Sequence, residues 1–212
     1  MNVRGPLFTL AAVAALGTGI LLVNEARRPA VSEPTAEPTA QLASPPAPAP
    51  ASPAPQQFAA QADYVGRVPT ADGLITLEIS IDGNRAIAYA CDGASVEVWL
   101  RGTAANGAVN LQSKDASSRL DGRLRGDEVG GLLTVGDKSW RYTAPAVVPA
   151  AGLYRYDGDG ERAGWIVNSG AEVTGVLRRS DGTTVPAPEL TTDATSVRNG
   201  RTVAAPRVPG DD

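Results

Sequence analysis

The sequence contains no histidine and a single cysteine, Cys91. Without histidine the chain cannot build a Ser-His-Asp triad, a Cys-His dyad or an imidazole metal site. One cysteine also excludes an intrachain disulfide and a cysteine-cluster metal centre. Lysine is rare, with 2 residues beside 17 arginines, and the formal net charge is -4. Because phosphate backbones are bound by clustered positive charge, nucleic acid is not an expected partner. We expect no cofactor and no metal.

The chain begins with an uncharged segment, residues 5–23, in which Leu, Ala, Val and Ile dominate. As a helix rising 1.5 Å per residue it would span roughly 28 Å, close to the hydrocarbon thickness of a bilayer. Glu25, Arg27 and Arg28 follow this segment, and charge so near its end disfavours cleavage by a signal peptidase. The sequence predicts a signal-anchor over residues 1–28 with a transmembrane helix at about 5–23. A cleaved signal peptide and a buried soluble helix are the alternatives.

A Pro/Ala-rich stretch, residues 29–61, comes next and holds nine prolines between Pro29 and Pro55. Such a composition favours an extended, disordered linker with polyproline II character, up to ~90 Å long at ~3.1 Å per residue. Arginines flank the apolar segment on both sides, so the positive-inside rule does not decide its orientation. A long stalk is most useful where a domain is held away from a membrane. We therefore expect a single-pass protein of the cytoplasmic membrane with its folded domain outside the cytoplasm.

Residues 62–185 have the alternating pattern of short antiparallel strands. In the clearest segment the apolar residues share one face: Ile75, Leu77, Ile79 and Ile81. Turn pairs such as Asp82-Gly83 and Asn106-Gly107 separate about eight such strands between Tyr64 and Ala144. Loops this short leave no room for the helical crossovers of a parallel sheet. The pattern predicts an all-β fold, a small antiparallel up-and-down barrel, with a two-sheet β-sandwich as the alternative.

Three further strands are expected between residues 151 and 178, and they either complete the barrel or form a small appended sheet. From residue 186 to residue 212 the sequence loses its period and is rich in Thr, Pro and Asp. We expect this tail to be disordered.

Several short motifs of the β region resemble a group of exported actinobacterial proteins, membrane-tethered β-domains with no assigned activity. The motifs are Tyr64-Val65-Gly66-Arg67, Ala88-Tyr89-Ala90-Cys91-Asp92-Gly93, Trp99-Leu100-Arg101-Gly102, Ala151-Gly152-Leu153-Tyr154 and Gly164-Trp165-Ile166-Val167. The resemblance covers roughly residues 62–178 and implies a cell-envelope context. Its motifs are structural, so it implies no catalytic or binding residues.

Two features invite a chemical interpretation. Cys91 shares a strand face with Ile87 and Tyr89, which predicts a buried structural thiol; a reactive thiol or an intermolecular disulfide is the alternative. The segment 157–161 alternates carboxylates with glycines, as calcium loops do. However, the sixth and twelfth positions of such a loop would be Arg162 and Asn168 rather than Gly and Glu. We interpret the segment as a polar hairpin tip.

Trp99 lies on the same strand face as Glu97 and Arg101. An aromatic ring flanked by charges is typical of a contact with a partner protein or a glycan, and these three residues are the predicted interaction surface. Coverage of Trp99 by the terminal strands is the alternative. Arg119, Arg123 and Arg125 form a basic stripe that we interpret as a solvated face rather than a site for an anionic polymer.

The sequence favours a non-enzymatic binding module of the cell envelope, anchored in the membrane by its N-terminal helix. Its partner would be an envelope protein or a cell-wall polymer. The alternative function is a barrel that binds a small apolar molecule or a lipid. An enzyme using only carboxylates, Arg, Tyr and hydroxyl groups is a third hypothesis, which a cleft holding two buried carboxylates would support.

Overall fold

The structure, a computed structural model, describes residues 56–212, and its regular secondary structure there consists of fourteen strands. The predicted signal-anchor and most of the predicted linker lie outside the described residues. Within residues 56–212 no helix has the length and apolar character needed to cross a membrane. The described end of the predicted linker runs along the β domain, where the ring of Phe58 packs edge-on against Tyr64 at a centroid distance of 6.1 Å.

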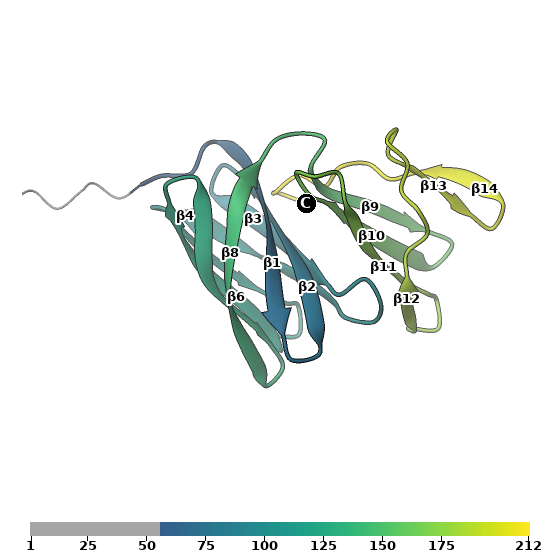
Figure 1. The fold of residues 1–212 in the computed structure, drawn as a ribbon, viewed down its shortest axis with the longest axis horizontal. Coiled ribbons are helices and arrows are strands. Elements are labelled where there is room, and N and C mark those ends of the chain that lie inside the picture. Colours follow the sequence, from purple (N-terminus) through teal and green to yellow (C-terminus); the bar gives the residue numbers. More distant parts are fainter. Residues whose placement is uncertain (1–55) are drawn as a thin grey trace, which may run out of the picture. The chain divides into compact units, whose positions relative to one another are not determined.

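Eight strands form a closed antiparallel barrel in which each strand pairs with its neighbours in sequence and β1 pairs with β8 (Figure 1). The strands are β1 (Gln61–Thr70), β2 (Gly73–Asp82), β3 (Arg85–Cys91), β4 (Glu97–Ala105), β5 (Ala108–Gln112), β6 (Ser118–Arg125), β7 (Glu128–Val135) and β8 (Lys138–Val147). This topology confirms the predicted up-and-down barrel and not the two-sheet sandwich. In the β4–β5 hairpin Asn106 and Gly107 adopt φ angles of 52° and 68°. Positive φ angles at both positions suit a two-residue turn, and Asn and Gly tolerate them.

The interior of the barrel is filled by apolar side chains of complementary size. The large inward residues of β2 stand opposite alanines of β3: Leu77 faces Ala90, Ile79 faces Ala88 and Ile81 faces Ala86. Large side chains from the later strands complete the same core, and all are fully or almost fully buried: Leu100, Val109, Leu111, Leu120, Val129 and Leu133. Large residues of β2 thus stand opposite small residues of β3 in the core of the barrel.

The three strands predicted after residue 150 form an appended sheet and do not enter the barrel (Figure 1). This second sheet has the order β12-β11-β10-β9 and is built from β9 (Gly152–Gly158), β10 (Glu161–Val167), β11 (Val173–Arg178) and β12 (Thr184–Pro186). One face of it packs on the outside of β2 and β3. The resulting interface cluster joins Val65, Ile87, Tyr89 and Cys91 of the barrel to Leu153, Ile166, Val176 and Val208.

The prediction of a disordered tail over residues 186–212 is wrong. The segment contains the hairpin of β13 (Thr195–Arg198) and β14 (Arg201–Ala204), and it buries Leu190, Ala205 and Val208. The last eight residues, 205–212, which we call the C-terminal segment, run along the free edge of β9. There the Val208 N–H donates to Leu153 O over 2.9 Å and the Arg155 N–H donates to Pro206 O over 3.0 Å. The segment is ordered because it completes a sheet edge and an apolar cluster.

Candidate functional site

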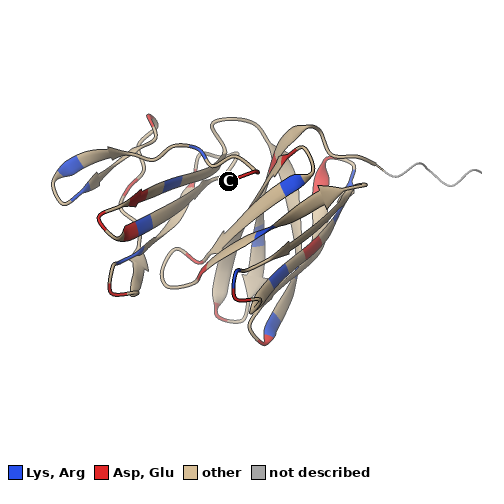
Figure 2. Ribbon diagram, turned by 180° about the vertical axis from the view of Figure 1, so that it is seen from behind, with Lys and Arg blue, Asp and Glu red and all other residues tan. Residues whose placement is uncertain are grey.

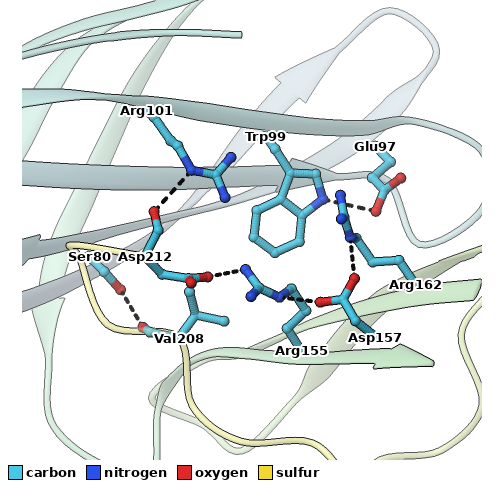
Figure 3. A network of polar contacts seen from close by, with 9 residues as sticks. All are labelled: Ser80, Glu97, Trp99, Arg101, Arg155, Asp157, Arg162, Val208 and Asp212. Atoms are coloured by element: carbon cyan, nitrogen blue, oxygen red, sulfur yellow. Dashed lines mark hydrogen bonds and ion pairs between the residues drawn. The ribbon is translucent and has the colours of Figure 1, made fainter. Parts of the chain in front are cut away.

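The predicted interaction residues lie on the outward face of β4, where the barrel meets the second sheet (Figure 3). Trp99 is half-buried there. Its ring stacks on Tyr89 with a centroid distance of 4.4 Å, and the guanidinium carbons of Arg155 and Arg162 lie 5.6 and 5.9 Å from its centroid. The second sheet thus holds two cations over an aromatic face, an attractive arrangement.

Glu97 and Arg101 also contact other parts of the chain. The Glu97 side chain is only 2% exposed and accepts hydrogen bonds from Trp99 Nε1 at 3.0 Å and from Arg178 Nε at 2.8 Å. Arg101 is exposed and donates from Nε to the Asp212 backbone oxygen over 2.9 Å. The structure therefore brings the three predicted residues together, but Glu97 and Trp99 serve the junction between the barrel and the second sheet.

A pocket of about 470 Å³ opens beside this junction, between β9 and the C-terminal segment. Four charged side chains line it, Arg155, Asp157, Arg207 and Asp212, together with Tyr156 and the flanking residues Ala204, Pro206, Val208 and Pro209. Arg155 joins the two carboxylates, because it forms ion pairs with Asp157 at 2.6 Å and with Asp212 (Figure 3). Burial lowers the pKa of Arg155, but its contacts with Asp212 and Asp157 together outweigh this effect and raise the pKa, so that the side chain remains charged. The wall of the pocket thus carries both signs of charge beside apolar proline rings.

Sequence reasoning missed this pocket because six of its nine lining residues come from the segment expected to be disordered. The sequence carries only a weak signal that this segment is ordered. Pro206 and Pro209 restrict the backbone around Val208 to extended geometry, which suits a strand edge.

A second feature that the sequence did not reveal is a polar cluster buried under the C-terminal segment. Glu78 on β2 is completely buried, and Ser80 on the same face lies 2.7 Å from Glu78 Oε1 and 2.8 Å from Asp63 Oδ1. Asp63 forms an ion pair with Arg207 at 2.9 Å. A smaller pocket of about 160 Å³ reaches Asp63 and Arg207 from outside. Two carboxyl groups, one hydroxyl and one guanidinium therefore meet at one place.

The surroundings of Glu78 are mostly apolar. Its cross-strand neighbours are Val65 on β1 and Tyr89 on β3, and its Oε2 atom has no hydrogen-bond partner among the described residues. Burial raises the pKa of Glu78 well above its ordinary value, because a carboxylate loses its hydration there, and the negative charge of Asp63 adds to this effect. Glu78 does not line either of the two pockets described.

Cys91 lies in the interface cluster, as its alternation predicted, and is fully buried. Burial raises the pKa of its thiol to about 12. A thiol with so high a pKa is almost entirely protonated at neutral pH, and the thiolate is the reactive form. The structure favours the structural role over the reactive one.

The acidic hairpin at 157–161 uses its carboxylates in ion pairs. Asp157 binds Arg155 and Arg162, the latter at 2.7 Å, and Glu161 binds Arg198. No group of three or more acidic or Cys side chains within residues 56–212 is arranged to hold a metal ion. The hairpin-tip interpretation agrees with these contacts.

The basic stripe on β6 is partly neutralised. Arg119 forms an ion pair with Asp121 at 2.6 Å, whereas Arg123 and Arg125 are exposed. Figure 2 shows Lys and Arg interspersed with Asp and Glu along the strands rather than gathered on one side. This distribution suits a solvated surface.

Comparison with known proteins adds no relative: no family model, curated protein or solved structure matches this chain.

Proposed function

We propose that the chain is a membrane-anchored, extracytoplasmic binding module of the cell envelope that acts without catalysis. The observation that carries the proposal is the position of the pocket between β9 and the C-terminal segment. It lies on the outside of a barrel whose inward side chains form a hydrophobic core. The long Pro/Ala-rich stretch before the β domain would hold this pocket away from the membrane.

The chemistry of the pocket indicates its class of ligand. Two guanidinium groups and two carboxylates line it next to prolines and Tyr156. A ligand that carries both an acidic and a basic group, such as a peptide segment of an envelope protein or of a cell-wall polymer, would pair with both. A neutral lipid would cover these charged side chains without offering them a charged or hydrogen-bonding group of its own, and this favours the binding module over the lipid-binding barrel.

Site-specific photo-crosslinking in intact cells tests the proposal. A benzophenone amino acid replaces Tyr156 in the pocket wall, and in the matched control it replaces Leu132, which is 43% exposed on β7. We expect an adduct of higher mass from the Tyr156 position alone. Equal labelling from both positions, or no adduct from Tyr156, would contradict a binding site in this pocket.

Protease protection tests the proposed topology. Protease added to spheroplasts should digest the β domain only where it lies outside the cytoplasmic membrane, with a cytoplasmic protein as the control for intact membranes. Survival of residues 62–212 in spheroplasts, followed by digestion after lysis, would place the domain inside.

A further inference from the structure

The Ser80 hydroxyl group has more acceptors around it than it can serve. Its oxygen lies 2.7 Å from Glu78 Oε1 and 2.8 Å from Asp63 Oδ1. A hydroxyl group carries one proton and donates one hydrogen bond. If both carboxyl groups were ionised, one of these short contacts would hold two oxygen atoms together with no proton between them. One of the two carboxyl groups therefore carries a proton and donates it to Ser80 Oγ.

The proton belongs to Glu78. Asp63 forms an ion pair with the Arg207 guanidinium at 2.9 Å, and the Asp63 side chain is 18% exposed. Glu78 is completely buried and forms no ion pair within 4.0 Å in the described part of the chain. The hydrogen-bond chain thus runs from the Glu78 carboxyl group to Ser80, from Ser80 to the Asp63 carboxylate, and ends at Arg207.

Each element around Glu78 contributes a defined group. The β1 strand supplies Asp63, β3 supplies the neutral phenol of Tyr89, and the C-terminal segment supplies Arg207. The second sheet contributes only apolar side chains of the interface cluster: Leu153, Ile166 and Val176. If Glu78 ionises, two carboxylates face a single guanidinium, and the carboxylate of Glu78 is completely buried. A buried charge without its own partner is strongly destabilising.

We propose that the proton on Glu78 locks the C-terminal segment onto the barrel, and that loss of this proton releases residues 205–212 and exposes the edge of β9. The segment is the part that yields, because only two backbone hydrogen bonds join it to β9, whereas complete ladders hold β1, β2 and β3 together. Further polar contacts of the segment to the barrel, to β9 and to Ala151 involve side chains, through Arg207 and the C-terminal Asp212. Its Val208 carbonyl lies 3.4 Å from Ser80 Oγ, directly over the cluster. The exposed edge of β9 would then accept an extended peptide by strand addition.

This inference goes beyond the proposed function and does not depend on it, because it concerns the free chain. Its test is amide hydrogen exchange at Val208 and Arg155, the two donors that hold the segment, followed by NMR on the full-length chain from pH 5 to pH 10. After correction for intrinsic exchange rates, we expect the protection of both amides to fall at least ten-fold as pH rises. In Glu78→Gln the neutral amide still donates to Ser80, so protection should stay high and independent of pH.

Glu97→Gln is the matched control, because Glu97 is also buried but lies at the Trp99 junction. It should keep the wild-type pH dependence at Val208. Asp63→Asn provides a second variant, because it removes the carboxylate that pairs with Arg207 and leaves Arg207 free to neutralise an ionised Glu78. The fall in amide protection at high pH should then be smaller than in the wild type. Constant protection in the wild type, or an unchanged fall in Glu78→Gln, would overturn the proposal. Because no ligand is added, neither outcome bears on whether the pocket binds a partner.

Discussion

Tyr89 and Trp99 stand opposite each other on β3 and β4, with their ring centroids 4.4 Å apart and their planes inclined by 43°. Tyr89 is fully buried and Trp99 is only half-buried, so the pair reaches from the interface cluster to the rim of the candidate site. Changes at the junction should therefore alter both the stability of the β domain and the signal from Trp99.

The first prediction concerns Gly164 on β10, against which the Tyr89 ring packs. A Cβ atom at Gly164 would lie 2.7 Å from Tyr89 Cζ, so Gly164→Ala forces the two sheets apart. We expect a loss of about 1–3 kcal/mol in the free energy of unfolding, the usual cost of overpacking. Urea unfolding followed by tryptophan fluorescence measures it. Gly130→Ala is the control, because its Cβ would have no neighbour closer than 3.7 Å. Equal stability of the two variants would refute this close approach.

The second prediction tests whether the barrel interior is full. Ala88 is completely buried there, opposite Ile79. In a packed interior Ala88→Leu has no space and should cost about 1–3 kcal/mol. In a barrel with an empty ligand chamber the same substitution fills space and would leave stability unchanged or increased. Thermal unfolding of the two proteins separates these outcomes, and an increase would revive the lipid-binding alternative.

The third prediction is a dependence of stability on pH. Glu78 has a folded-state pKa raised well above its ordinary value of 4.5, so the folded state keeps a proton that the unfolded state releases above that pH. The free energy of unfolding should therefore decrease as pH rises from about 4.5 towards the folded-state pKa. Chemical denaturation at pH 4, 6 and 8 measures this slope.

Two neutral variants should respond in opposite ways. At pH 8 the folded wild type must either hold a proton on Glu78 or bury its charge, and both cost free energy. Glu78→Gln removes this cost and should be more stable than the wild type. Glu97→Gln weakens charged hydrogen bonds to Trp99 and Arg178 and should lose about 1.5–3 kcal/mol. A Glu78→Gln variant with the full wild-type slope would show that another group causes the pH dependence.

The fourth prediction concerns Cys91, whose thiol is buried and has a pKa raised to about 12. Ellman's reagent at pH 8 should label the native chain at least a hundred-fold more slowly than the chain unfolded in guanidinium, because access and thiolate formation both require opening. Cys91→Ala supplies the blank. Rapid labelling of the native chain would indicate that the second sheet leaves the barrel readily.

The sequence pattern predicts the barrel well because its signals are local. Alternation from Ile75 to Ile81 and turn pairs such as Asn106-Gly107 depend on near neighbours. The outward residues Thr76, Glu78 and Ser80 have a pattern typical of a solvated face, yet they are buried by a sheet that lies more than 70 residues later in the chain. Alternation says which residues share a face but not what covers that face.

The candidate site was partly predictable for the same reason. The contacts of Trp99 in the structure are Tyr89, Arg155 and Arg162 of the same chain, so the second sheet partly covers it, and contact with a partner stays a prediction. Arg207 and Val208 carry only the weak local signal of the flanking prolines, since their order depends mainly on β9 and on the interface cluster. Reasoning from short windows therefore missed the pocket and the buried cluster together.

The closure of the barrel has a consequence for how the chain folds. Seven of the eight strand pairings join segments that are adjacent in sequence, and only the β1–β8 pairing, through Asp63 with Val147 and Tyr64 with Ala146, must wait for the last strand. Until then the outer edge of β1 has no partner. Because a chain is synthesised from its N-terminus, this edge would stay exposed until β8 is available, which makes it the point most open to aggregation or to a chaperone.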